Sequence, residues 1–137
     1  MRRRQFIGTI STTVCAPALV AWAKPAKIKI GQIGIVHAHA RGKLAAIRAL
    51  PEEYELVGVV EPNAALRKGM SGVKFISEEQ LLNTKGLRAV AVETRVRDLV
   101  PTAARVFASG RQVHLDKPAG PSLPAFLKLV ADARRQP

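Results

Sequence analysis

The stretch of sequence that decides the fold is residues 28–40, Ile-Lys-Ile-Gly-Gln-Ile-Gly-Ile-Val-His-Ala-His-Ala. Its first part, Ile28 to Ile35, is a near-continuous apolar run, which is typical of a strand buried on both faces of a sheet. Residues 41–50 follow with apolar side chains at helical spacing, and Pro51 ends that pattern. Because a buried strand leads directly into a helix, the stretch predicts the opening of a βαβ unit.

The same alternation of short apolar strands and helical patterns continues along the chain. The predicted strands are residues 28–35, 55–60, 73–76, 87–92 and 112–115. The predicted helices are residues 41–50, 64–69, 77–82, 98–109 and 122–135, the third of which opens on an S-x-x-Q capping box at Ser77. Such alternation gives a parallel sheet with helices on both faces. We therefore predict an α/β fold over residues 28–137, a doubly wound parallel sheet of about five strands with right-handed crossovers.

Length and composition restrict the class of protein. A chain of 137 residues allows one domain, and a hydrophobic content of 47% excludes a wholly disordered chain. The single cysteine, Cys15, excludes a disulfide framework and a cysteine-based zinc site. The net charge of +12 points toward an anionic partner, but the basic residues are scattered, without blocks of like charge or interleaved aromatic residues. We therefore expect no nucleic-acid partner.

The first 23 residues have the features of an export signal. Arginines at positions 2–4 precede an apolar stretch without acidic residues, and the stretch ends in the small-x-small pattern Ala-Trp-Ala at positions 21–23. The order Arg-Arg-Gln-Phe-Ile over residues 3–7 resembles a bacterial twin-arginine signal. We predict a signal peptide over residues 1–23, a short leader over residues 24–27, and a mature protein exported to the periplasm.

A short membrane anchor is the alternative for the same segment. Its apolar residues are interrupted by Ser11, several threonines and Pro17, whereas a spanning helix needs about 20 mostly apolar residues. We therefore expect no stable membrane span once the signal is removed, and Cys15 would be lost with it.

The turn after the first predicted strand is the first candidate binding element. A dinucleotide fold needs a tight glycine turn there, so that pyrophosphate can approach backbone N–H groups at a helix N-terminus. The usual fingerprint is G-x-G-x-x-G, and here Gly34 fits its first position, Val36 stands at the second and His39 at the third. We take Gly34, Val36 and His37 as candidate cofactor-binding residues, with an ordinary strand-to-helix turn as the alternative.

Glu61 ends the second predicted strand, and residues 29–61 have the length of a βαβ unit, about 30 residues. A carboxylate at that position can accept hydrogen bonds from both hydroxyls of an adenosine ribose, and it repels a 2′-phosphate. Glu61 therefore favours NAD over NADP as the cofactor. The alternative is a loop acid that precedes Pro62.

His37 and His39 are two residues apart in the turn after the first strand. A metal site needs a further ligand, such as a carboxylate, and the neighbouring sequence offers none, so we predict no metal site. We expect the pair to line the phosphate or substrate side of the crevice, or to face solvent.

Two further candidates directly follow predicted strands, where a parallel sheet places its ligands. Asp116-Lys117-Pro118 comes after residues 112–115. Lys117 could donate to a substrate hydroxyl or carbonyl and assist proton transfer, with Pro118 keeping its backbone extended. A purely structural turn is the alternative. Thr94, which follows the fourth predicted strand, could hydrogen-bond a cofactor or begin a helix.

Four segments carry a resemblance to a known family. They are Ile-Lys-Ile-Gly-Gln-Ile-Gly (28–34), Val-Gly-Val-Val-Glu-Pro (57–62), Ala-Val-Ala-Val-Glu-Thr (89–94) and Gly-Arg-Gln-Val-His-Leu-Asp-Lys-Pro-Ala (110–119). In this order they resemble the N-terminal nucleotide-binding domain of the Gfo/Idh/MocA oxidoreductases. The last segment resembles the family's Glu-Lys-Pro turn, with Asp116 in place of the glutamate.

The resemblance implies a Rossmann domain that binds NAD(P), within an oxidoreductase that acts on CH–OH groups of a sugar or polyol. It implies the pyrophosphate at Gly34, the adenosine ribose at Glu61, the nicotinamide half near Thr94, and the catalytic edge at Lys117. Asp116, Lys117 and Pro118 are also candidate cofactor-binding residues. In the family a substrate domain follows the position of Pro137. We therefore expect this chain to be the cofactor-binding part, inactive alone.

The chain departs from the family at two positions, since Val36 and His39 stand where the later fingerprint glycines occur. This departure favours a second interpretation. In it, the chain is a non-catalytic exported Rossmann module that acts through a partner protein.

Overall fold

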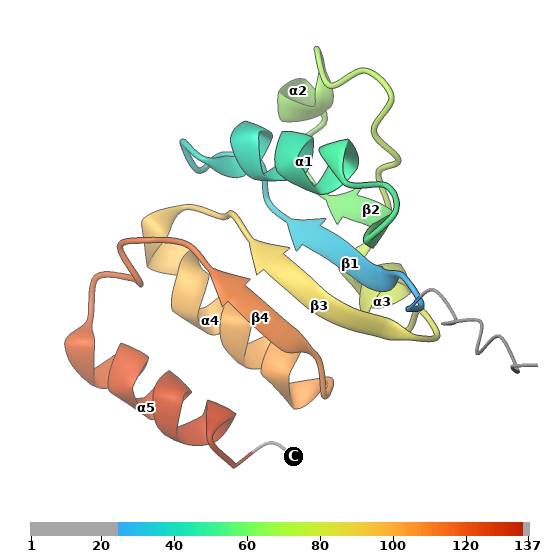
Figure 1. Cartoon of the computed structure of the whole chain (residues 1–137). Coiled ribbons are helices and arrows are strands. Elements are labelled where there is room, and N and C mark those ends of the chain that lie inside the picture. Colours follow the sequence, from blue (N-terminus) through green and yellow to red (C-terminus); the bar gives the residue numbers. More distant parts are fainter. Residues whose placement is uncertain (1–24, 136–137) are drawn as a thin grey trace, which may run out of the picture.

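A computed structural model describes residues 25–135, so the predicted signal peptide with Cys15 and the final two residues lie outside the described part. Its strands are β1 (Ile28–Ile33), β2 (Tyr54–Val60), β3 (Leu87–Val92) and β4 (Gln112–Leu115). Its helices are α1 (Ala40–Ala49), α2 (Ala64–Arg67), α3 (Glu78–Leu82), α4 (Val96–Ala108) and α5 (Leu123–Ala133), as Figure 1 shows. No helix within residues 25–135 is long and apolar enough to cross a membrane.

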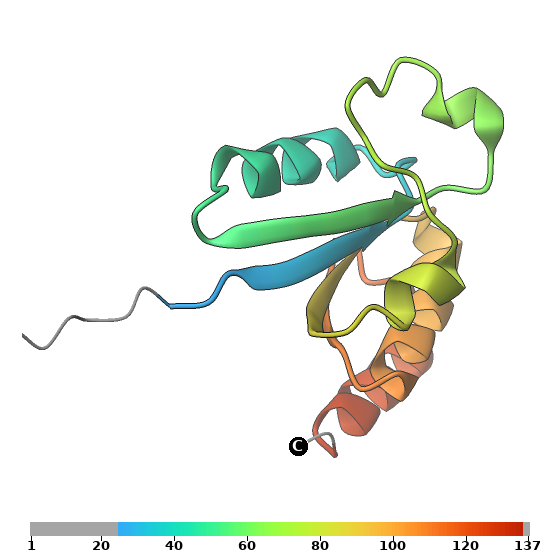
Figure 2. The same ribbon diagram turned by 90° about the vertical axis from the view of Figure 1, so that its right-hand side faces the viewer.

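The four strands are all parallel and lie in the order β2-β1-β3-β4 (Figure 1). Helix α1 covers one face of the sheet, and α3, α4 and α5 cover the other (Figure 1 and Figure 2). The chain therefore changes face after β2. This confirms the predicted α/β fold with a doubly wound parallel sheet, which places ligand sites at the carboxyl ends of the strands.

The predicted strand at residues 73–76 is wrong, because this segment forms a single parallel bridge between Val59 and Phe75. The Val59 N–H donates to the Lys74 carbonyl at 2.9 Å, and the Ile76 N–H donates to the Val59 carbonyl at 3.0 Å. The pairing stops there because Ser77 already caps α3. The described sheet therefore has four strands, one fewer than we predicted.

The main core lies between the sheet and helices α3 and α4. Val90 and Val92 of β3 pack there with Leu81 of α3 and Leu99 of α4, and all four side chains are fully buried. Because side chains alternate between the two faces of a strand, Glu93 at the end of β3 points to the other face, toward α1. This alternation decides which residues at the sheet edge can meet.

Local sequence signals set most helix boundaries. Ser77 and Gln80 form the predicted capping box of α3 with both reciprocal hydrogen bonds. Ser122 caps α5 by accepting a hydrogen bond of 3.4 Å from a backbone N–H in its first turn. Helix α4 begins at Val96, earlier than predicted, and Pro101 therefore lies in its second turn rather than its first.

Candidate functional site

The turn after β1 carries the chain over the carboxyl edge of the sheet, and Gly34 makes this turn possible. Gly34 has φ +88°, a left-handed conformation that favours glycine, and its N–H donates to the Val60 carbonyl at 2.8 Å. A Cβ atom at this position would lie 2.7 Å from the Glu93 carbonyl oxygen and 2.8 Å from the Thr94 nitrogen. Because these are backbone atoms at the end of β3, no side chain fits here.

Gln32 fixes the same turn from the side of α1. Its side chain is fully buried, and its Nε2 donates to the Gly34 carbonyl at 3.0 Å and to the Ala40 carbonyl at 3.4 Å. These contacts join the end of β1 to the first residue of α1. The first-turn N–H groups of α1 are therefore held at the sheet edge, where an anion can accept from them.

A cleft of about 820 Å³ opens at this edge, between the ends of β1 and β2 and helices α3 and α4. Several sequence-predicted residues line it, namely Gly34, Val36, Glu61 and Thr94. Sites for small molecules and cofactors have volumes of about 300–1,000 Å³. The structure thus brings candidates from three strand ends into one concave site large enough for a ligand.

Glu61 is a nearly buried carboxylate in the wall of the cleft, with 5% of the residue exposed. Its Oε1 accepts from the Asn63 N–H at 2.9 Å, and its backbone carbonyl accepts from Arg67 Nε at 2.5 Å. A carboxylate has about four acceptor positions, so Oε2 keeps the capacity to accept hydrogen bonds from a ligand.

Arg67 and Phe75 line the cleft together with Glu61, and sequence analysis missed both. The guanidinium carbon of Arg67 lies 5.5 Å from the centroid of the Phe75 ring, a cation–π distance. An arginine shortly after a strand-ending acid was a usable signal for Arg67. Phe75 gave no such signal, because the surrounding pattern predicted a strand.

Thr94 is half-buried at the cleft, and its hydroxyl donates to the Arg95 carbonyl at 3.4 Å. It does not cap α4, because Arg95 occupies the N-cap position without a side-chain cap bond. Thr94 directly precedes this N-cap, so it lies in the polar turn that leads into α4. The lone pairs of the hydroxyl remain available to a ligand in the cleft.

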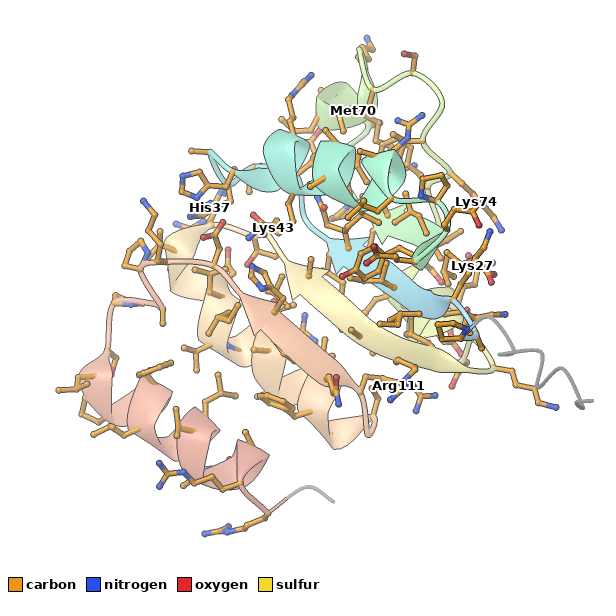
Figure 3. The ribbon with its side chains drawn as sticks, in the orientation of Figure 1. Lys27, His37, Lys43, Met70, Lys74 and Arg111 are labelled. Atoms are coloured by element: carbon orange, nitrogen blue, oxygen red, sulfur yellow. The ribbon has the colours of Figure 1, made fainter. Side chains whose placement is uncertain are left out.

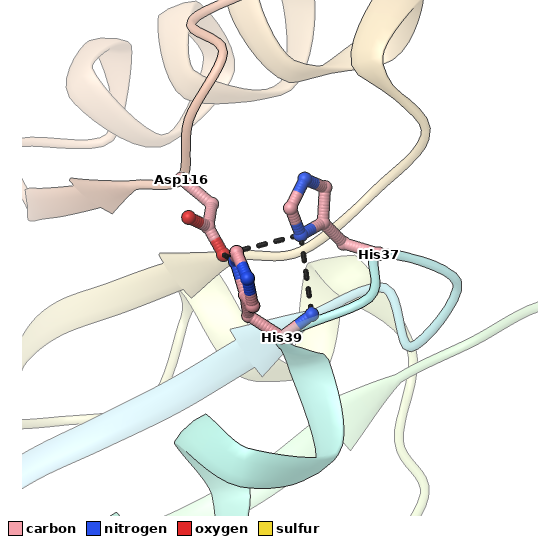
Figure 4. A group of neighbouring side chains, drawn as sticks. All are labelled: His37, His39 and Asp116. Atoms are coloured by element: carbon pink, nitrogen blue, oxygen red, sulfur yellow. Dashed lines mark hydrogen bonds and ion pairs between the residues drawn. The ribbon is translucent and has the colours of Figure 1, made fainter.

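The other candidates gather on the opposite face of the sheet edge, where α1 begins. Nδ1 of His37 and Nδ1 of His39 each lie 3.1 Å from Asp116 Oδ2 (Figure 4). Lys43 Nζ lies 3.2 Å from Glu93 Oε1 and 3.6 Å from Asp116 Oδ2, and Figure 3 shows Lys43 and His37 on this side of the sheet. We call these residues the histidine–carboxylate cluster: His37, His39, Lys43, Glu93 and Asp116.

Burial has opposite outcomes for the two carboxyl groups of this cluster. Burial raises the pKa of Glu93, and the Lys43 ammonium offsets part of that rise. Burial also acts to raise the pKa of Asp116, but hydrogen bonds and nearby positive charge outweigh it and hold that pKa below its usual range. Foremost among them is the Lys117 N–H, which donates to Asp116 Oδ1 at 2.7 Å. The pKa values of the two acids are thus shifted in opposite directions, and Asp116 is the carboxyl group that stays ionised.

Lys117 and Pro118 follow Asp116 onto the surface. Both residues are exposed, and the peptide bond between them is cis. The residues that line the cleft do not include these two, nor His37 or Asp116. The structure therefore divides the predicted site residues into a cleft group and a cluster group, with Lys117 beside the cluster.

Sequence analysis also missed Glu93 and Lys43 as members of the cluster. Glu93 directly follows β3, as Glu61 follows β2 and Asp116 follows β4, so a repeated acid at strand ends was a usable signal. Lys43 is four residues after His39, a spacing that places two side chains on one helix face.

Comparisons with known proteins find solved structures that share this architecture. No protein-family profile and no curated protein matches the sequence. The WlbA dehydrogenase from Bordetella pertussis, in complex with NADH and UDP-GlcNAcA, matches with a TM-score of 0.69 and 21% identity, over 81% of this chain and 35% of that one. The WlbA dehydrogenase from Chromobacterium violaceum, with the same ligands, matches with a TM-score of 0.70 and 19% identity, over 80% and 33%. An NAD-binding protein from Listeria innocua matches with a TM-score of 0.70 and 21% identity, also over 80% and 33%.

These likenesses show the fold, which is the Rossmann-like α/β fold present in NAD-binding oxidoreductases. The chain spans 33–35% of the length of these solved structures. One fold serves many chemistries, so the function must be argued from the residues of the site.

Proposed function

We propose that this chain is the NAD-binding part of an oxidoreductase that acts on CH–OH groups of a sugar or polyol. The cleft at the carboxyl edge of the sheet carries the proposal. In this cleft Gly34 has no side chain to cover the backbone, and Glu61 holds a carboxylate in the wall. The resemblance of four segments to the Gfo/Idh/MocA oxidoreductases supports it. The fold shared with NADH-bound dehydrogenases supports it as well.

The residues of the cleft fit the successive parts of a dinucleotide. Gly34, which has no side chain to cover the backbone of the turn after β1, suits the approach of a pyrophosphate. Glu61 Oε2 suits the ribose hydroxyls, and Phe75 with Arg67 offers a flat aromatic and guanidinium surface for adenine. Val36 places a side chain in the cleft where the fingerprint has a glycine, so it narrows the approach to the pyrophosphate.

Glu61 also supports NAD over NADP. A 2′-phosphate on the ribose would face the carboxylate, and two negative charges at short range repel each other. Arg67 acts in the opposite sense, because a guanidinium near the ribose can pair with a phosphate. Its Nε is already engaged by the Glu61 carbonyl, which limits that pairing.

Lys117 is the residue to which we assign proton transfer in the intact oxidoreductase. A bound nicotinamide supplies the hydride chemistry at the CH–OH carbon. Lys117 is exposed at the sheet edge, and its backbone is anchored by its own N–H on Asp116. Its ammonium can therefore donate to a substrate oxygen and exchange a proton with it.

Cofactor binding by the full chain tests the proposal, measured by NADH fluorescence and by calorimetry. We expect saturable binding that weakens about 10-fold or more in Glu61→Gln, because a hydrogen bond to a charged group contributes about 1.5–3 kcal/mol. Glu55→Gln is the matched control, since Glu55 lies on β2, the strand that Glu61 follows, with an exposed carboxylate 3.4 Å from Lys29 Nζ. Failure of the chain to bind NADH at millimolar concentration would overturn the assignment.

A non-catalytic module that acts through a partner protein is the second candidate function. The observation that favours it is the Val36 side chain in the cleft. Val36→Gly separates the two candidates. If the natural chain does not bind NADH and Val36→Gly does, the cleft has lost its cofactor and the second candidate holds. If both bind, the second candidate is excluded.

We also propose that the protein is exported to the periplasm by the twin-arginine route. Residues 1–23 are the support for this proposal. Fused to a reporter that folds in the cytoplasm, the segment should direct the reporter to the periplasm. Replacing Arg3 and Arg4 by lysine should keep the reporter in the cytoplasm, and export that survives this replacement contradicts the proposal.

A further inference from the structure

We propose that the histidine–carboxylate cluster binds a divalent transition-metal ion, with His37, His39 and Asp116 as ligands and Glu93 beside them. The sequence alone offers two histidines without a third ligand. The fold supplies it, because Asp116 is 77 residues away from His39 in the chain and lies in contact with it.

The geometry of the ligand atoms carries the proposal. His37, His39 and Asp116 each offer one ligand atom, an imidazole nitrogen or a carboxylate oxygen, and these three atoms all lie within 4.8 Å of one another. The Asp116 oxygen is 3.1 Å from each imidazole nitrogen, with both histidines reaching it from the turn before α1 (Figure 4). Zinc binds such atoms at about 2.0–2.2 Å, so the ligands of one ion are roughly 3–3.5 Å apart. Small side-chain rotations would therefore bring all three atoms around one ion.

Contacts behind the ligands hold them in place. The His37 N–H donates to the Glu93 carbonyl at 3.2 Å, which ties the turn to the end of β3. The Lys117 N–H engages Asp116 Oδ1 at 2.7 Å, so Oδ2 is the oxygen presented to the histidines. Supporting hydrogen bonds of this kind orient the ligands of known metal sites.

The burial of Glu93 is a second indication of a cation site, independent of these three residues. Its side chain is 0% exposed, and neither carboxylate oxygen has a hydrogen-bond partner within residues 25–135. Oε2 lies 3.7 Å from His37 Nδ1, so the carboxylate is directed into the cluster. A buried carboxylate without hydrogen bonds is unfavourable, and a metal ion among these atoms would relieve it.

Lys43 supplies positive charge at the same place, with Nζ 3.2 Å from Glu93 Oε1 and 3.6 Å from Asp116 Oδ2. Its side chain is 23% exposed, and its flexible four-carbon stem lets the ammonium move toward solvent. Lys43 and a metal ion therefore compete for the same carboxylates. It follows that removal of Lys43 should strengthen metal binding, an effect that a merely structural residue would not produce.

The donor atoms select the class of metal. Two imidazole nitrogens with carboxylate oxygens suit Zn²⁺, Co²⁺ and related ions, whereas Mg²⁺ and Ca²⁺ prefer oxygen ligands throughout. Three protein ligands are also typical of zinc sites that keep a position open. That position would take water or, if the proposed function holds, an oxygen of the substrate near Lys117.

The test is titration of the full chain with Co²⁺ and then Zn²⁺, without an affinity tag and with Cys15→Ser to remove the thiol. We expect a single Co²⁺ ion per chain, seen by its visible absorption and displaced by Zn²⁺. His37→Gln, His39→Gln and Asp116→Asn should each weaken binding at least about 10-fold. Lys43→Met should strengthen it.

Glu55→Gln is the control, because Glu55 carries an exposed carboxylate on β2 that pairs with Lys29 and lies outside the cluster, whereas His114 contacts Lys43. The proposal is overturned if the chain binds no Zn²⁺ at millimolar concentration, or if His37→Gln and His39→Gln bind Co²⁺ as well as Glu55→Gln does. His39→Gln decides the matter if Asp116→Asn does not fold, since the His39 side chain is 45% exposed. The readout is the metal itself, so a failure of NADH binding leaves this test intact.

Discussion

Residues that are neighbours in the chain at the carboxyl edge of the sheet lie on opposite faces of the sheet. Val36 and Thr94 line the cleft beside α3 and α4. Their neighbours His37 and Glu93 lie in the histidine–carboxylate cluster on the side of α1. Strand alternation accounts for the direction of Glu93 at the end of β3, and the turn after β1 carries Val36 and His37 to opposite sides, so one edge of the sheet has two regions of different chemistry.

The two regions differ in how their carboxylates are compensated. In the cleft, Glu61 accepts one backbone N–H and faces an open volume of about 820 Å³, so a ligand must supply further donors. In the cluster, Glu93 Oε1 and Asp116 Oδ2 lie 3.2 and 3.6 Å from Lys43 Nζ, so a single ammonium faces two carboxylates. The difference teaches that the cleft suits a large ligand rich in hydroxyl groups, and the cluster a small cation.

The largest expected effect comes from the turn that both regions share. Gly34→Ala would place a Cβ 2.7 Å from the Glu93 carbonyl oxygen at a residue with φ +88°, and we expect a loss of about 3 kcal/mol in the free energy of unfolding. Gly110→Ala is the control, because Gly110 has φ +74° and nothing within 4 Å of its added Cβ. Gly110→Ala should lower the free energy of unfolding by about 1 kcal/mol, which is the cost of the backbone strain alone. Equal losses in urea unfolding would show that packing against β3 does not require this glycine.

Lys43→Met should affect the cluster and spare the cleft. Without metal, it leaves the Glu93 and Asp116 carboxyl groups without their nearest ammonium, and we expect a loss of about 2 kcal/mol in the free energy of unfolding. Zn²⁺ should restore more stability to this variant than to the natural chain, as measured by thermal unfolding. Lys128→Met, which removes an exposed ion pair on α5, should change stability little. Loss of NADH binding in Lys43→Met would argue against the independence of the two regions.

The fold was largely predictable from the sequence because buried parallel strands are continuous apolar runs. The runs that became β1, β2, β3 and β4 were all found in this way. The error at residues 73–76 has a physical reason. Val73, Phe75 and Ile76 are apolar as in a strand, but pairing depends on a partner, and here only Val59 of β2 meets the segment before α3 begins.

The two regions were not equally predictable. The cleft was found because a glycine turn and a strand-ending acid, Gly34 and Glu61, are local signals. The cluster was not found because it depends on the strand order β2-β1-β3-β4, which brings the turn after β1 close to the end of β4. Asp116 and His39 are 77 residues apart, and no local pattern connects them.

Glu61→Ser sharpens the assignment of the cleft to NAD. It removes the carboxylate that accepts from ribose hydroxyls and leaves Arg67 beside the same pocket. We expect NADH affinity to fall about 10-fold to 100-fold. NADPH affinity should rise relative to NADH, because the repulsion of a 2′-phosphate is gone. Parallel titrations of the two cofactors measure the ratio, and an unchanged ratio would place the ribose away from Glu61.

The smallest expected effect concerns an ion pair at the rim of the cleft. Arg105 of α4 donates from Nε to Glu78 Oε1 at 2.7 Å and from a terminal nitrogen to Oε2 at 3.1 Å. The pair joins α3 to α4 but is partly exposed, so Glu78→Gln should lose only about 0.5 kcal/mol in the free energy of unfolding. Glu79→Gln is the control, because Glu79 is also an acid in the first turn of α3 and shares its interaction with the helix dipole. A difference well above about 1 kcal/mol between the two variants would mean that this pair clamps the helices together. In that case NADH affinity should fall in Glu78→Gln as well, since both partners line the cleft.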